Sequence, residues 1–254
     1  MIPTFLINLD RAPDRLAFMA GQGIVFERIP GIDGTSNLPG WLRPQFAGAI
    51  ADATMSAGEI GCYASHLVCA DEIVERELAC AIVLEDDVTL EPDFMATASL
   101  AVAAAPAGWD YIHLSTNYKR AVVHVCDLPG RSRMLVRHTR LPVNSAAYIL
   151  SQAGARKWLR ERPRARPNDM DIRYAWLDDL DVFGVFPAPA RQLGNFQSSI
   201  RHDGKQRWSP GIASELYGLV WQARRVGAGN LVKARLADLR SRSRGRARAV
   251  PVIQ

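Results

Sequence analysis

Three consecutive carboxylates, Glu85, Asp86 and Asp87, are the residues of this 254-residue chain best suited to chemistry. They directly follow the apolar run from Ala81 to Leu84, whose length and β-branched content predict a strand buried on both faces. Open α/β sheets bind ligands where their strands end, and carboxylate oxygens suit Mg²⁺ or Mn²⁺ carrying a phosphate. The pattern favours a metal-assisted transferase that uses a nucleotide-linked donor. The alternative is an acidic turn that merely stays solvated.

The elements that must position this cluster alternate between strands and helices. Strands are predicted over Thr4 to Leu9, Gly23 to Ile29, Ala81 to Leu84, Trp109 to Ser115, Ala121 to Cys126, Met134 to Thr139, Ala146 to Leu150 and Asp181 to Phe186. Helices are predicted from Pro13, over Ala57 to Glu77, Glu91 to Ala105 and Gln152 to Arg160, and from Asn168 to Trp176, with a loop from Thr35 to Asp52. This order predicts an α/β domain with a mixed, mostly parallel sheet and helices on both faces.

The helix from Ala57 begins with a capping box, because Ser56 is followed three residues later by Glu59. Gly58 and Gly61 lower helix propensity in its first turns, so we expect another part of the chain to approach the backbone there. His66, farther along the same helix, is expected to be a buried or hydrogen-bonded histidine, because one histidine makes no metal site.

Composition and charge limit the other possibilities. The four cysteines form no CxxC pair, which indicates reduced, buried thiols and no zinc site or disulfide framework. The net charge of +5 is unevenly distributed: residues 224–248 contain nine Lys or Arg and one acid, so this segment carries +8 and the rest −3. No signal peptide or run of eighteen apolar residues is visible, so a cytoplasmic protein is expected.

Several sequence blocks, in order, resemble glycosyltransferase family 25, the group that includes bacterial lipooligosaccharide and collagen galactosyltransferases. They are FLINLDRAPDR at Phe5 to Arg15, GEIGCYASHL at Gly58 to Leu67, AIVLEDDV at Ala81 to Val88, AAYILSQAGARKWL at Ala146 to Leu159 and, more loosely, RPNDMDIRYAW at Arg166 to Trp176. The resemblance implies a GT-A type fold, a UDP-sugar donor such as UDP-galactose, a glycan acceptor, a divalent cation (Mn²⁺ or Mg²⁺) and inverting transfer.

The resemblance also implies roles for individual residues. Asp87 would bind the cation, with Glu85 near the ribose or assisting through water. His202 would complete the metal shell, although a solvent-exposed histidine is the alternative. The residues expected around the nucleotide donor are Asn8, Asp10, Arg11, Arg15, Asp33, Glu59, Glu85 and Asp86.

An inverting displacement needs a base that takes the proton from the acceptor hydroxyl. Asp169 is the first candidate by resemblance, and Asp171 is the second; the alternative for Asp169 is a helix cap. Arginines near Pro129 would suit an anionic acceptor or form a solvated face. They are Arg131, Arg133, Arg137 and Arg140.

The last 49 residues are expected to be an appendage, so that residues 1–205 form the transferase domain and 206–254 a helical, basic segment. Apolar residues from Ile212 to Ala223 recur at helical spacing before the arginine run. Such a segment could hold the enzyme on the inner face of an anionic membrane, beside a lipid-linked acceptor. The alternative is a helix packed on the body, followed by a solvated tail.

Two other functions are compatible with the sequence. The basic tail could bind nucleic acid, but it lacks interleaved aromatic residues and the body is net acidic, so nucleic acid is not the expected partner. A catalytically inactive relative that binds nucleotide sugar or glycan would keep the pocket and show no turnover.

Overall fold

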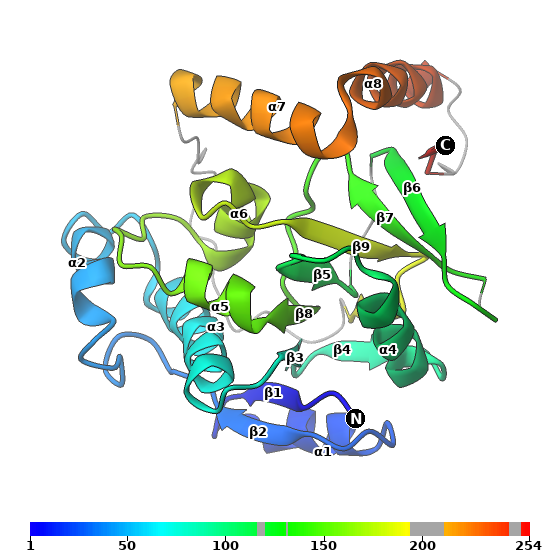
Figure 1. Cartoon of the computed structure of the whole chain (residues 1–254). Helices are drawn as coiled ribbons and strands as arrows, with labels where there is room; N and C mark the ends of the chain where they lie inside the picture. The colour runs from blue at the N-terminus through cyan, green and yellow to red at the C-terminus, as the bar shows by residue number, and fades with distance from the viewer. Residues whose placement is uncertain (116–119, 131, 194–210, 244–249) are drawn as a thin grey trace.

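The computed structural model describes residues 1–115, 120–130, 132–193, 211–243 and 250–254. Its strands are β1 (Thr4–Asn8), β2 (Glu27–Pro30), β3 (Cys80–Glu85), β4 (Val88–Leu90), β5 (Tyr111–His113), β6 (Val122–Asp127), β7 (Met134–His138), β8 (Ala147–Ser151), β9 (Val182–Phe186), β10 (Ala190–Gln192) and β11 (Val252–Ile253). Nine of them form one sheet in the order β11-β6-β7-β9-β5-β8-β3-β1-β2, and β10 pairs with β4 separately (Figure 1).

The sheet is mixed, as predicted. Among the described strands, β1–β2, β1–β3, β5–β9 and β6–β11 pair in parallel. The other four pairs of the large sheet are antiparallel, including the predicted hairpin of β6 and β7. Parallel and antiparallel pairs are therefore equal in number. Strand β8 lies between β3 and β5 and is antiparallel to both, so β3 and β5 run in the same direction.

Helices cover both faces of the sheet, as predicted. They are α1 (Pro13–Ala20), α2 (Arg43–Ala51), α3 (Ala57–Glu75), α4 (Phe94–Ala104), α5 (Gln152–Trp158), α6 (Asn168–Arg173), the 3₁₀ turn η1 (Ala175–Leu177), α7 (Ile212–Val226) and α8 (Ala228–Ser243). Each face of the sheet has its own hydrophobic core, and alternate β3 residues point into each. Val83 packs with residues of α3 and α5, and Leu84 packs with residues of α4. Strand β3 is buried on both faces for this reason.

The predicted loop over Thr35 to Asp52 is wrong in its second half, which is helix α2. Leu42, Phe46 and Ala49 are buried, with the i, i+4, i+7 spacing of one helix face, and Pro44 lies in the first turn where a helix tolerates it. Packing of this short apolar face against the core outweighs the low helix propensity of the segment.

Helix α3 has the predicted capping box: the Glu59 backbone N–H donates to Ser56 Oγ at 3.2 Å, and the Ser56 N–H donates to Glu59 Oε2 at 2.7 Å. The expected close approach occurs at Gly61. A Cβ there would lie 2.3 Å from the backbone oxygen of Ile32 and 2.8 Å from the nitrogen of Gly34. Helix α3 thus packs directly on the turn that follows β2.

The C-terminal segment packs on the main sheet. Gly218 and Trp221 of α7 are buried, and a Cβ on Gly218 would meet the Trp176 ring at 2.7 Å. Strand β11 adds Val252 and Ile253 to the edge strand β6. The apolar residues Ile212 and Leu216 of α7 are exposed, at 82% and 59%. No helix among the described residues is long and apolar enough to cross a membrane.

Candidate active site

The acidic cluster lies at one edge of the sheet, where β1 and β3 end side by side. These strands are parallel neighbours, and Ile7 is in register with Glu85. Asn8 therefore leaves the sheet beside Glu85 and the turn formed by Asp86 and Asp87. The arrangement matches the expected position of ligands in an α/β sheet.

Asp86 holds this edge together. Its Oδ2 accepts a hydrogen bond from Asn8 Nδ2 at 2.7 Å, and its Oδ1 accepts one from Arg15 at 2.9 Å. Asn8 also receives a hydrogen bond from Arg28 on its Oδ1. Asn8, Arg15 and Asp86, predicted to contact the donor, thus bond to one another and fix the loop after β1 against the acidic turn.

Asp87 differs from its neighbour. Its Oδ2 accepts a hydrogen bond from Gln192 at 3.1 Å, while its buried Oδ1 has no hydrogen-bond partner among the described residues. Burial, and then the nearby charge of Glu85, raise the pKa of Asp87 to about 6. A buried carboxylate oxygen without a hydrogen-bond donor is destabilised in its charged form, so a bound cation would stabilise the Asp87 carboxylate.

Glu85 is held in place from one side. His66 Nε2 lies 3.2 Å from Glu85 Oε1, and the Ser145 hydroxyl donates to the same oxygen at 3.1 Å. His66 is fully buried, and its Nδ1 lies 2.9 Å from the Tyr148 hydroxyl. Burial would raise the pKa of Glu85, but the hydrogen bonds from His66 and Ser145 lower it below its usual value. Glu85 is therefore a fixed carboxylate, with Oε2 left unbonded to described residues.

These residues fit a hard divalent cation. Asp87 Oδ1 and Glu85 Oε2 offer two carboxylate oxygens, the donor type that Mg²⁺ and Mn²⁺ prefer. Among the described residues, the group of three possible ligands whose ligand atoms lie within 4.8 Å of one another is Cys62, His66 and Glu85, and it does not include Asp87. However, burial and the surrounding acids raise the pKa of the Cys62 thiol well above its usual value, which disfavours the thiolate needed for metal binding.

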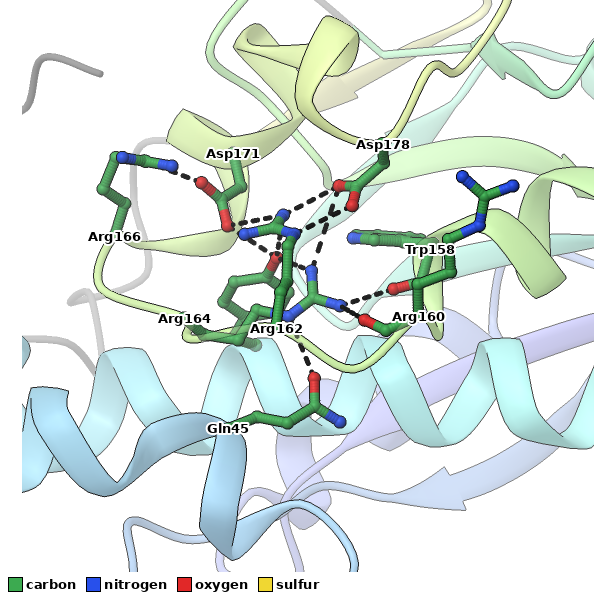
Figure 2. Close-up of polar contacts among 9 residues, drawn as sticks. Gln45, Trp158, Arg160, Arg162, Arg164, Arg166, Asp171 and Asp178 are labelled. Carbon is green, nitrogen blue, oxygen red and sulfur yellow. Dashed lines mark hydrogen bonds and ion pairs between the residues drawn. The ribbon is translucent and has the colours of Figure 1, made fainter. Parts of the chain in front are cut away.

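The two candidate bases have different surroundings. Asp171 is 1% exposed and accepts hydrogen bonds from Tyr63 at 2.7 Å, from Arg166 at 2.8 Å and from Arg162 at 3.1 Å. Figure 2 shows this cluster, in which Arg162 also bonds to Asp178 and the buried Arg164 reaches Gln45. Asp171 is thus committed to ion pairs inside the protein.

Asp169 is less buried than Asp171. It is half-buried in the first turn of α6. After burial, the charges of Glu85, Asp169 and Asp87 each raise the pKa of the Cys62 thiol. The three carboxylates, two from the end of β3 and the turn after it and one from α6, therefore act on the same thiol. Of the two candidates, Asp169 is the one whose charge reaches the same thiol as Glu85 and Asp87.

The other predicted site residues are farther from this centre or already engaged. Asp10 forms an ion pair with Arg28, and Arg11 forms one with Asp33; Asp10, Arg11 and Asp33 have largely exposed side chains. Glu59 caps α3 through its contacts with Ser56. His202 lies outside the described residues.

A family model described as "Glycosyltransferase family 25 (LPS biosynthesis protein)" matches residues 1–165. The chain belongs to glycosyltransferase family 25. The match includes Asn8, His66 and the three acids of the β3 edge, and it ends before Asp169.

The curated relatives of this family 25 member carry different descriptions. "Inactive glycosyltransferase 25 family member 3" of Mus musculus is 29% identical over 80% of this chain and 38% of its own length. The protein of that name in Homo sapiens is 30% identical over 75% of this chain and 37% of its own length. "Procollagen galactosyltransferase 2" of Mus musculus is 35% identical over 35% of this chain and 16% of its own length. The chain thus spans less than two fifths of these relatives.

Four residues that bond to Glu85 or Asp87, or to His66, were not predicted as site residues: His66, Ser145, Tyr148 and Gln192. For His66, the prediction of a buried, hydrogen-bonded histidine is confirmed, but its partner Glu85 was not foreseen. His66 lies in the GEIGCYASHL block and Tyr148 in the AAYILSQAGARKWL block, so these motifs were a usable signal. No sequence motif pointed to Gln192 or Ser145, because their contacts with the acidic residues arise only from long-range packing.

Proposed function

We propose that this family 25 protein is an inverting, metal-dependent glycosyltransferase of GT-A type that transfers a sugar from a UDP-sugar to a hydroxyl of a cell-surface glycan. The observation that carries the proposal is Asp87, whose buried Oδ1 has no hydrogen-bond partner within the described part of the chain and lies near the fixed carboxylate of Glu85. UDP-galactose is the first donor to test, because a relative over part of the chain is described as a galactosyltransferase.

In this proposal Asp87 and Glu85 hold Mn²⁺ or Mg²⁺. When bound, the cation would neutralise the charge that develops on the departing diphosphate. His66 and Ser145 keep Glu85 in one orientation, and Asn8 and Arg15 do the same for the turn through Asp86. Orientation by neighbouring side chains is what allows carboxylates to bind without reorganising.

Asp169 is the proposed base. It would accept the proton of the acceptor hydroxyl on the face of the sugar opposite the diphosphate, as an inverting displacement requires. The ion pairs of Asp171 with Arg162 and Arg166 hold α6 in place, and so position Asp169. Asp171 itself has its oxygens occupied and is better suited to this supporting role.

A second candidate function is a catalytically inactive protein that binds nucleotide sugar or glycan. It is favoured by the description of two of the relatives as inactive. Purified protein incubated with Mn²⁺ and a panel of UDP-sugars separates the two. The transferase releases UDP from at least one donor, and Asp87→Asn does not. Binding of UDP without release from any donor would contradict the catalytic proposal and support the inactive one.

We also propose that the protein works at the inner face of an anionic membrane, where a lipid-linked acceptor would be located. Support comes from Ile212, Leu216 and Val220, which are exposed on α7, and from the basic segment that follows. Vesicles with and without phosphatidylglycerol test this placement. We expect co-sedimentation with anionic vesicles that is reduced by Leu216→Ser. Equal recovery with neutral vesicles would contradict it.

A further inference from the structure

A cavity of about 480 Å³ lies between the C-terminal helices and the body. This volume is typical of small-molecule sites, which span roughly 300–1,000 Å³. Its walls come from the end of α6, the residues after β7, and the facing sides of α7 and α8. None of its lining residues belongs to the carboxylate cluster of the active site.

Arginines from separate elements converge on this cavity: Arg140 after β7, Arg173 at the end of α6 and Arg235 in α8. None of these three forms an ion pair with a described residue. A fourth, Arg120, lies 3.5 Å from Asp238 and is balanced by it. Glu215 is the other acid in the lining, so the cavity has an excess of positive charge. Guanidinium groups gathered without partners favour an anion, and their planar donors match phosphate.

The remaining wall is aromatic. Tyr174, Trp176 and Trp221 line the cavity, and the Tyr174 and Trp176 rings meet edge to face with centroids 5.1 Å apart. Trp176 is fixed by a hydrogen bond to Ser214 and by contact with Gly218. Rigid aromatic faces beside charged donors suit a sugar that carries a phosphate, because the ring packs on the aromatic surface while the phosphate meets the arginines.

The cavity is linked to the active site through α6. Asp169 and Arg173 are four residues apart in this helix, so they share a face and are separated by about 6 Å along the axis. A ligand held by Arg173 would therefore lie about one helical turn from the proposed base.

We propose that this cavity binds a phosphate group of the acceptor glycan, so that Arg140, Arg173 and Arg235 select a phosphorylated acceptor. The inference rests on the proposed glycosyltransferase function, and it adds the chemical class of the acceptor. The phosphate could belong to a soluble sugar phosphate or to the head of a lipid-linked glycan, and the chemistry of recognition is the same.

Calorimetric titration of the full chain tests the proposal with glucose 1-phosphate, glucose and inorganic phosphate as probes. We expect glucose 1-phosphate to bind at least tenfold more tightly than glucose. Arg173→Gln combined with Arg140→Gln should weaken binding of glucose 1-phosphate at least tenfold. Arg156→Gln is the matched control, because Arg156 is exposed in α5 and does not line the cavity. Unchanged binding in the double variant, or equal loss in the control, would overturn the proposal.

Two further measurements keep the outcomes distinct. Binding of UDP with Mn²⁺ should be unchanged in the double variant, because it depends on the carboxylates of the active site. This measurement therefore distinguishes damage to the active site from a loss of phosphate binding in the cavity. Vesicles containing phosphatidic acid identify the source: competition with glucose 1-phosphate indicates a lipid-borne phosphate, and its absence a soluble one. Failure of glucose 1-phosphate and of the vesicles to bind wild-type protein would overturn the proposal, whatever the result of the UDP-sugar assay.

Discussion

The adjacent aspartates Asp86 and Asp87 at the end of β3 are expected to have opposite effects on stability, and single substitutions distinguish their roles. Asp86 accepts hydrogen bonds from Asn8 and Arg15, so Asp86→Ala should lower the free energy of unfolding by about 2–3 kcal/mol. Asp87 Oδ1 has no partner among the described residues, so Asp87→Asn should leave metal-free stability unchanged or raised. Urea unfolding in EDTA measures both. Equal destabilisation by the two substitutions would show that Asp87 is also structural.

Asp169 and Asp171 offer a second contrast between nearby carboxylates. Asp171→Asn breaks buried ion pairs with Arg162 and Arg166 and should cost about 3–5 kcal/mol. Asp169→Asn should stay within about 0.5 kcal/mol of wild type, abolish transfer and spare donor binding. Unfolding curves and transfer assays on the same preparations check both. An active Asp169→Asn variant would mean that the base lies elsewhere.

At the scale of elements, the approach of α3 to the turn after β2 is testable with glycine substitutions. Gly61→Ala would place a Cβ 2.3 Å from the Ile32 oxygen and should destabilise the fold by at least about 2 kcal/mol. Gly48→Ala in the exposed face of α2 is the matched control, because a Cβ there meets nothing within 4 Å. It should stabilise by about 0.5–1 kcal/mol. Thermal unfolding of both variants distinguishes close packing from a general effect of alanine.

Most elements could be predicted because their patterns are local. The apolar run ending at Leu84 and the Ser56–Glu59 capping box each depend on neighbouring residues, and both are present. Helix α2 was missed because its apolar face is only two turns long. The site was predicted in part: the acidic edge of β3 is where expected, but the partners of Asp86 and Glu85 come from other segments of the chain. Asn8 is 78 residues away, Arg15 is 71, Ser145 is 60 and His66 is 19.

The arginine cluster behind α6 shows the same limit. The segment from Glu161 to Arg166 has the composition of a charged surface connection, yet Arg164 is 1% exposed. Its guanidinium contacts Tyr63 and Gln45, which are 101 and 119 residues away in sequence. Such a cluster forms only when α2, α3 and α6 pack together, so no local sequence pattern predicts it.

For the whole molecule, stability should decrease on mild acidification. Burial, and then His138, lower the pKa of His113 well below its usual value, and burial lowers that of His138 to about 4. In the unfolded chain both histidines take up protons near pH 6.5, so between pH 6.5 and 4 the unfolded state binds more protons. The free energy of unfolding should fall across this window, by about 3 kcal/mol for His138 alone.

His113→Phe tests this origin of the acid sensitivity. The ring nitrogens of His113 have no hydrogen-bond partner among the described residues, so phenylalanine should be tolerated and should reduce the pH slope. Chemical unfolding at pH 5 and 7 measures the slope. An unchanged slope in the variant would assign the acid sensitivity to other groups.

In the proposed function, Asp87 and Glu85 form a divalent cation site that serves a UDP-sugar. Titration of Mn²⁺ in the presence of UDP, followed by electron paramagnetic resonance of the free ion, tests it most directly. We expect one bound ion per wild-type chain, with affinity reduced at least tenfold in Asp87→Asn and retained in Arg156→Gln. Equal Mn²⁺ binding by wild type and Asp87→Asn would contradict the claim.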